Sequence, residues 1–318
     1  MRLTALSAIL TAALAATASL PAWAEAPKVV VSIKPIHSLV ASVMHGVGEP
    51  TLLVRGGASP HSYTMKPSDA KALSAADLVV WVGPELEGFL EKPLQANAPK
   101  ATRLTLMDLK SLTLLQAREG GAWEPHDHGH EQHDHKDHAH GDHEDHEELN
   151  SHIWLDPANA RAIVTATADA LAAKDPADAE AFRTNADRTL QALDALDAEL
   201  KTTLAPLKDK PFVVFHDAYQ YFEAHYDLSA VGSITVSPDR RPSAKRLSAI
   251  RAKIAGLNAA CVFSEPQFEP TLVRTVVEGT RAKTGVLDPE GADLPEGEAL
   301  YPTLMRNLAA SLRGCLGA

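Results

Sequence analysis

The sequence predicts an α/β protein of two lobes, each a mostly parallel sheet flanked by helices, joined by a single long α-helix. Three observations predict this fold. Short β-branched runs alternate with helical stretches in both halves, the halves repeat a similar order of motifs, and a long glycine-free stretch lies between them. With 318 residues, 45% of them hydrophobic, the chain is long enough for about two domains of roughly 150 residues.

The first residues have the features of an export signal. Arg2 precedes an apolar run from Leu3 to Leu20, and Ala22-Trp23-Ala24 has the small-residue pattern after which signal peptidase cuts. An uncleaved membrane anchor is the alternative, but the short apolar core favours cleavage. We therefore expect residues 1–24 to be a signal peptide. No cysteine lies near the cut to carry a lipid, which favours a soluble periplasmic protein.

The N-terminal lobe is expected to span residues 25–175. Four runs in it are typical of strands: Val29–Ser32, Thr51–Val54, Leu78–Val82 and Arg103–Leu106. Strands that alternate with helices predict a parallel sheet covered by helices. Within this lobe, residues 116–150 have almost no apolar periodicity, and we expect a disordered loop there.

A single helix is predicted to link the lobes over residues 176–207. The stretch Pro176–Leu204 is rich in Ala, Leu and charged residues and opens with Pro at a plausible first helical position. At about 1.5 Å per residue it would reach roughly 43 Å, enough to run along both lobes. The C-terminal lobe, residues 208–318, has predicted strands at Phe212–Phe215, Ala260–Ser264 and Gly285–Leu287 and a helix at Ser243–Gly256 capped by Ser243.

The charge of the chain is concentrated in one segment. The formal net charge is −11, and removal of the signal with Arg2 takes it to −12. Between Glu124 and Glu148, ten acidic residues face only Lys136, which gives −9 and leaves −3 for the rest. No basic stripe exists to neutralise phosphates, so nucleic acid is excluded as a partner.

The same segment holds nine of the fifteen histidines, mixed with Asp and Glu. They are His126, His128, His130, His133, His135, His138, His140, His143 and His146. Neutral imidazole binds zinc, copper and nickel, so we expect auxiliary metal binding here. Ordering a flexible chain costs about 1 to 2 kcal/mol per residue, so such a loop gives capacity more readily than selectivity. A merely solubilising loop is the alternative.

A selective metal site needs ligands on rigid elements, and isolated residues at strand ends are candidates. His61 follows the Thr51–Val54 strand through a Gly-Gly turn, His216 directly follows Phe215, and Asp288 directly follows Leu287. Ligands in open α/β sheets gather at the carboxyl ends of strands. His152 lies just past the loop. Three imidazoles and one carboxylate would complete a four-coordinate zinc site, although by spacing alone each histidine is more often an ordinary core or surface group.

The local motifs favour the metal site. They are Gly56–Tyr63, Ser151–Pro157, Phe215–Phe222, Ser264–Phe268 and Leu287–Pro289. In these motifs the chain, from about Lys28 to its C-terminus, resembles the ZnuA family, the periplasmic zinc-binding components of bacterial zinc-import ABC transporters. The resemblance implies a metal-type periplasmic binding protein with a rigid linking helix and the metal between its lobes.

The resemblance also assigns the ligands. By motif, His61, His152 and His216 correspond to the three histidine ligands of the family, and Asp288 to the carboxylate that is a ligand in several relatives. Manganese-binding relatives usually carry Glu at the third position, so His216 favours zinc. Some zinc-binding members place Glu where this chain has Pro60, which leaves Asp288 as the expected fourth ligand and water as its rival.

Cys261 and Cys315 are the only two cysteines, in a chain bound for an oxidising compartment. We expect them to form a disulfide, and the resembling family carries a similar pair of cysteines. Zinc ligation is the alternative, but the two lack the close spacing of structural zinc sites.

The resemblance implies a solute-binding protein, not an enzyme, that captures Zn²⁺ and delivers it to a membrane ABC permease with its ATPase for high-affinity import. The His-rich loop would collect or sense zinc and receive it from a periplasmic chaperone, and we expect a monomer. The alternatives are a manganese-specific binding protein and a periplasmic zinc hydrolase, which needs an open metal position and a general base. No HExxH motif supplies that base. Glu265 and Asp217 are candidates to orient the imidazoles.

Overall fold

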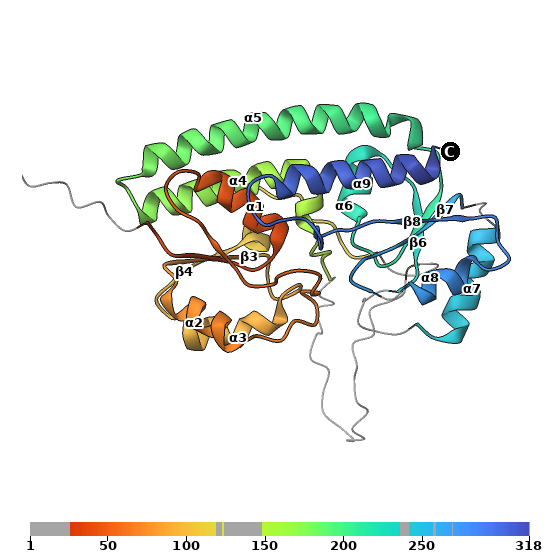
Figure 1. Cartoon of the computed structure of the whole chain (residues 1–318), viewed down its shortest axis with the longest axis horizontal. Coiled ribbons are helices and arrows are strands. Elements are labelled where there is room, and N and C mark those ends of the chain that lie inside the picture. Colours follow the sequence, from red (N-terminus) through yellow and green to blue (C-terminus); the bar gives the residue numbers. More distant parts are fainter. Residues whose placement is uncertain are drawn as a thin grey trace, which may run out of the picture.

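The computed structural model describes residues 26–118, 123, 148–235, 242–256, 259–268 and 270–317. The predicted signal peptide and all nine histidines between residues 126 and 146 lie outside these residues. The described chain forms two four-stranded sheets, one in each lobe, flanked by helices (Figure 1). The predicted fold class is therefore confirmed.

The sheet of the N-terminal lobe has the strand order β2-β1-β3-β4, and all its pairs are parallel. Its strands are β1 (Val29–Val31), β2 (Thr51–Leu52), β3 (Leu78–Trp81) and β4 (Thr102–Thr105). All residues of β1 and β3 are buried, because helices cover both faces of the sheet. The helices α2 (Pro67–Ala75) and α3 (Gly88–Asn97) lie on one face, and α1 (Lys34–Val43) lies on the other (Figure 1).

The sheet of the C-terminal lobe repeats this order as β6-β5-β7-β8, so the repeat of motifs corresponds to a repeat of topology. Its strands are β5 (Phe212–Val214), β6 (Ala230–Ser233), β7 (Cys261–Ser264) and β8 (Lys283–Val286). Its helices are α6 (Gln220–Tyr226), α7 (Ala244–Gly256) and α8 (Thr271–Val277). The predicted cap of α7 is confirmed, since the Ser243 hydroxyl accepts the backbone N–H of Arg246 at 3.2 Å.

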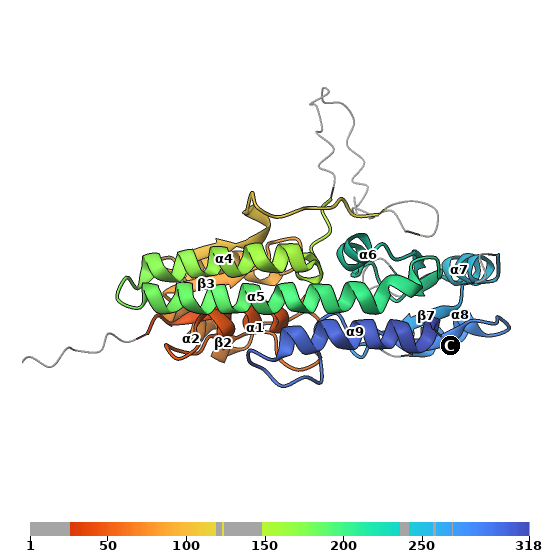
Figure 2. The ribbon, with the colours of Figure 1, turned by 90° about the horizontal axis from the view of Figure 1, so that it is seen from above.

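Three long helices run along the molecule. They are α4 (Pro157–Lys174), α5 (Ala179–Leu204) and α9 (Leu300–Leu316), and α5 passes over both lobes between the other two (Figure 2). The predicted linking helix is thus present, although it begins after Pro176, because the chain turns between Asp175 and Asp178. The domain boundaries at residues 175 and 207 stay predictions. Among the described residues, no helix has both the length and the apolar character that a bilayer crossing requires.

Short 3₁₀ turns complete the connections: η1 (Leu106–Asp108), η2 (Ile153–Leu155) and η3 (Ala205–Leu207). The turn η2 lies at the boundary between the lobes. Its Trp154 is fully buried and donates its indole N–H to the carbonyl of Pro289 at 2.8 Å. The hydroxyl of Tyr301 in α9 donates to the Trp154 carbonyl at 2.9 Å. Trp154, just before α4, is therefore joined to the C-terminal part of the chain by two hydrogen bonds.

A buried lysine makes a second connection between the lobes. Lys34, at the start of α1, is 4% exposed and points its ammonium at the loop after β8. It donates to the carbonyls of Gly291, Ala292 and Leu294 at 2.6, 2.9 and 2.7 Å. Burial lowers the pKa of Lys34, against the opposing effect of Asp288 and nearby carboxylates. The three carbonyls replace the water that this group loses.

The predicted disulfide is confirmed: Cys261 at the start of β7 is bonded to Cys315 near the end of α9. Replacing both cysteines with Ala should lower the free energy of unfolding by about 4 kcal/mol, because the bridge closes a loop over a sequence separation of 54 residues. Urea unfolding of the zinc-free protein measures this. The unaltered protein in reductant should match the variant, and an unchanged unfolding midpoint in both would contradict the prediction.

Candidate metal centre

Three histidines from the two lobes meet in the described structure. His61 lies in the loop after β2, beyond a turn that Gly56 makes with a φ of +65°. His152 directly precedes η2. Phe215 follows the last residue of β5, and His216 comes next. Their ligand atoms all lie within 4.8 Å of one another. No other group of three or more His, Cys, Asp or Glu residues among the described residues meets this condition.

The separations between the ring nitrogens fit a zinc ion. The Nε2 atoms of His61 and His152 are 3.4 Å apart, and those of His152 and His216 are 3.1 Å apart. Zinc binds imidazole nitrogen at about 2.0 to 2.1 Å in tetrahedral geometry, which places ligand nitrogens about 3.3 Å from each other. The three side chains are therefore arranged so that they could hold one ion.

Hydrogen bonds at the opposite ring nitrogens assign the tautomers. The Nδ1 of His152 lies 2.9 Å from the Asn150 side-chain oxygen, and the Nδ1 of His216 lies 2.7 and 2.8 Å from the two carboxylate oxygens of Glu265. Amide and carboxylate oxygens accept hydrogen bonds, so each ring carries its proton on Nδ1. The Nε2 lone pairs of His152 and His216 then face each other, and a cation bound between them would relieve their repulsion.

One of the two predicted orienting carboxylates occupies that role. Glu265 follows β7, is 2% exposed, and also accepts the hydroxyl of Tyr219 at 3.3 Å. The Asp217 carboxylate instead binds Arg118. Asn150 was not identified from the sequence. Its signal is the position two residues before His152, from which an Asn side chain reaches the backbone N–H, here at 3.0 Å.

Asp288, the predicted fourth ligand, is not part of the group of three. Its carboxylate accepts four N–H groups, which organise the loop after β8. They belong to the backbone of Glu290, Gly291 and Ala292 and to the side chain of Gln267, at 3.1, 2.9, 2.6 and 2.9 Å. Coordination by Asp288 would have to replace or share these bonds, and its role as ligand stays a prediction.

The remaining described histidines, His37, His45 and His225, have other partners. The Nε2 of His37 faces the Pro50 carbonyl at 3.0 Å, and His45 pairs with Glu298 at the surface. His225 lies between two carboxylates. Its Nδ1 pairs with Asp156 and its Nε2 pairs with Asp197. Hydrogen bonding to Asp156 raises the pKa of His225 despite its partial burial.

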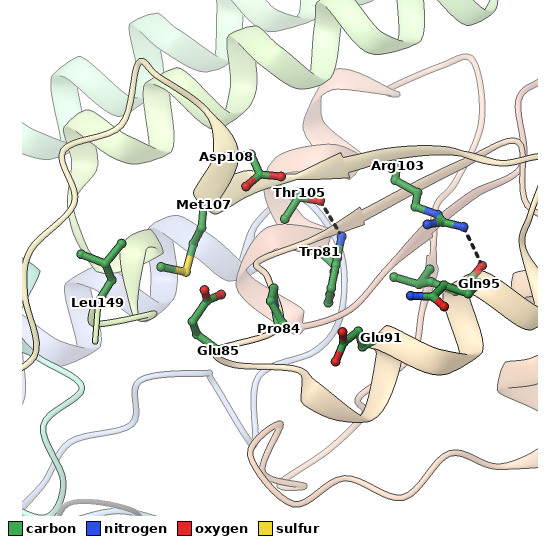
Figure 3. A pocket seen from close by; sticks show the side chains of 11 residues that line it. Trp81, Pro84, Glu85, Glu91, Gln95, Arg103, Thr105, Met107, Asp108 and Leu149 are labelled. Atoms are coloured by element: carbon green, nitrogen blue, oxygen red, sulfur yellow. Dashed lines mark hydrogen bonds between the residues drawn. The ribbon is translucent and has the colours of Figure 1, made fainter. Parts of the chain in front are cut away.

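A cavity of about 330 Å³ adjoins the histidines. His61 and His152 line it together with Glu85, Ala117 and Glu148, so both described ends of the His-rich segment reach the cavity. A neighbouring cavity of about 350 Å³ shares Pro84, Glu85 and Leu149 with it and continues toward α3 (Figure 3). The metal site is thus accessible from the side on which the His-rich segment leaves the fold.

Comparison with known proteins agrees with the family resemblance of the sequence motifs. The family model for "Zinc-uptake complex component A periplasmic", ZnuA, matches residues 29–315. The chain is 48% identical over 304 residues to the high-affinity zinc uptake system protein ZnuA of Brucella abortus, with 91% of both chains covered. It is 40% identical over 322 residues to the protein of the same name from Paracoccus denitrificans, with 98% of both covered.

Solved structures share the fold. A crystal structure of ZnuA covers 92% of this chain and 99% of its own, with a TM-score of 0.74 and 24% identity. A ZnuA deletion mutant with zinc bound gives a TM-score of 0.75 at the same identity, over 92% of this chain and 99% of its own.

Acid should destabilise the zinc-free protein through two of the three histidines. Burial, and secondarily the neighbouring His216, lowers the pKa of His61 to about 3; the same cause lowers the pKa of His152 well below its usual value. Unfolded, both imidazoles take up protons near pH 6.5, so below that pH the unfolded state binds more protons and stability falls.

Urea unfolding at pH 7.5 and 5.5 measures this loss, which should be about 1 kcal/mol for each of the two histidines. A variant with His61→Gln and His152→Gln provides the control, because other titrating groups remain in it. Its stability should fall less on acidification than that of the unaltered protein, and equal losses would contradict the assignment.

Proposed function

The chain belongs to the ZnuA family of periplasmic zinc-uptake components, and on this premise we propose that it captures Zn²⁺ between its two lobes and delivers the ion to an ABC permease for high-affinity import. Zinc is the cargo, and the ATPase of the transporter drives its passage. The protein acts in the periplasm as a monomer, after export by the signal at residues 1–24.

The observation that carries this proposal is the convergence of three imidazole nitrogens from both lobes, with Asn150 and Glu265 holding two ring protons away from the ion. Neutral nitrogen donors bind zinc more strongly than manganese, which prefers oxygen ligands. Depressed pKa values at His61 and His152 keep these two rings neutral and able to bind metal at periplasmic pH. The site therefore supports selective zinc capture.

The fourth coordination position and the loop complete the proposal. Asp288 is the proposed fourth ligand, with water as the alternative. The nine histidines between residues 126 and 146 act as an auxiliary collector or sensor that accepts zinc from a periplasmic chaperone. The position of Ala117 and Glu148 at the cavity beside His61 and His152 supports this role, because it brings both ends of the segment to the metal site.

Replacing any one of His61, His152 or His216 with Ala should weaken zinc binding more than about 100-fold, since even residues that only orient ligands contribute about 10- to 100-fold. Competition with a chromophoric chelator measures the affinity. His45→Ala is the matched control, because this histidine is exposed and pairs with Glu298 outside the site.

The same titration extends to the fourth ligand and to the choice of metal. A large loss of affinity in Asp288→Asn would support the carboxylate as ligand, and wild-type affinity would support water. Manganese should compete poorly with zinc on the unaltered protein. Unchanged zinc affinity in all three histidine variants would contradict the proposed site.

Removing residues 124–147 should lower the number of zinc ions bound and leave the tightest one in place. Glu148 is retained, because its carbonyl accepts the N–H of Ala117 at 2.8 Å. A second variant that replaces the nine histidines with Gln keeps the length and the acidic residues. Equilibrium dialysis with metal analysis gives the stoichiometry, and loss of the tightest ion in either variant would place the main site in the segment.

A further inference from the structure

Both ends of the His-rich segment form a small two-stranded structure, which we call the root and define as residues 115–118 and 148–150. Gln116 and Leu149 form an antiparallel bridge. The N–H of Ala117 donates to the carbonyl of Glu148 and the N–H of Asn150 donates to the carbonyl of Leu115, both at 2.8 Å. The root lies between β4 and α4 in the sequence, and so belongs to the N-terminal lobe.

The root nevertheless binds the C-terminal lobe, through α6. The hydroxyl of Tyr221 accepts the N–H of Leu115 at 3.0 Å and donates to the carbonyl of Asn150 at 2.7 Å. The side-chain amide of Gln220 donates to the carbonyl of Gln116 at 2.9 Å and accepts the amide N–H of Asn150 at 3.0 Å. Each strand of the root is therefore held by the same two residues of α6.

A buried ionic cluster reinforces this attachment. The guanidinium of Arg118 donates to both carboxylate oxygens of Asp217, with its Nε at 3.1 and 3.0 Å, and to both oxygens of Glu223 at 2.6 and 3.0 Å. Only 21% of the Arg118 side chain, 13% of Asp217 and 6% of Glu223 is exposed. The ring of Trp123 covers the guanidinium, with its centroid 3.6 Å from the central carbon. The planar guanidinium can donate paired hydrogen bonds to two carboxylates at once, which a lysine ammonium cannot do in this geometry.

The cluster leads directly to two of the metal ligands. Asp217 is the neighbour of His216 in the chain, and its backbone carbonyl accepts the side-chain amide of Asn150 at 2.9 Å. The oxygen of that same amide orients His152. One network thus fixes a ligand of each lobe, on the two sides of the 3.1 Å gap between their Nε2 atoms.

We propose that Arg118 is a positioning residue for zinc retention: by holding the root on α6 through Asp217 and Glu223, it keeps His152 and His216 at the separation that one zinc ion needs. This inference rests on the proposed function, and it assigns the root a role independent of the nine histidines between residues 126 and 146. Ligands must stay within about 0.5 Å of their productive positions, so a loosened root speeds the release of the ion.

The test is Arg118→Gln in the full-length protein. Zinc release into excess chelator, followed by stopped flow, should become about tenfold faster, at the lower end of the effect of groups that orient ligands. The visible spectrum of the cobalt(II)-loaded protein, which reports ligand geometry, should change. Arg118→Lys keeps the charge without the planar guanidinium and should give an intermediate rate.

Arg306→Gln is the matched control. Arg306 makes a similar bidentate pair with Glu199 between α9 and α5, at 2.8 to 3.0 Å, but both side chains are about half exposed and neither lines the cavity beside His61 and His152. Its release rate and cobalt spectrum should equal those of the unaltered protein.

A double variant separates positioning from simple destabilisation. Arg118→Gln leaves two buried carboxylates unpaired, and adding Glu223→Gln removes one of these charges. Unfolding stability should recover partly while zinc release stays fast. Wild-type release and spectrum in Arg118→Gln, or a return to wild-type release in the double variant, would overturn the inference and leave the proposed function intact. An unaltered protein that binds no zinc would overturn both.

Discussion

The approach of imidazoles from two lobes to within reach of one cation is the constraint on which the rest of the molecule depends. The Nε2 atoms of His152 and His216 lie 3.1 Å apart on opposite sides of the boundary between the lobes. Tetrahedral zinc needs about 3.3 Å between ligand nitrogens, so relative movement of the lobes by even 1 Å would break the site. The fold must therefore hold its two halves in register, and the arrangement of the long helices and of the boundary residues follows from this need.

That register is maintained by packing that involves no metal. A single apolar core contains residues of both sheets, of α5 and of α9, and it surrounds the fully buried Trp154. Lys34 ties α1 to the carbonyls of the loop after β8. Because these groups are buried and paired, a wide opening of the lobes would expose apolar surface and strand a buried ammonium.

The parts of the fold and of the candidate site that could be predicted are those that a local sequence pattern encodes. Alternating β-branched runs revealed seven of the eight described strands, but β6, with the sequence Ala-Val-Gly-Ser, has weak strand propensity and was missed. The three histidines that converge were predicted as a set by their motifs, since residues 64 and 91 positions apart have no periodic relation. Asn150 was missed although its position two residues before His152 is a local signal. Arg118 pairs with Asp217 and Glu223 of the other lobe, and no local pattern encodes such contacts.

The two populations of histidine illustrate opposite solutions to one physical problem. Nine histidines in a segment rich in acidic residues supply many equivalent donors, and each ion bound there must organise its own ligands. At the candidate metal centre, Asn150 and Glu265 orient the rings of His152 and His216, and burial lowers the pKa of His61 and His152, which favours their neutral forms. Folding has already ordered these donors, so binding an ion there requires little further loss of conformational entropy. The same burial lowers the stability of the zinc-free protein in acid. In the proposed function, selectivity therefore resides with three histidines that are far apart in sequence, and the nine others raise the local supply of the ion.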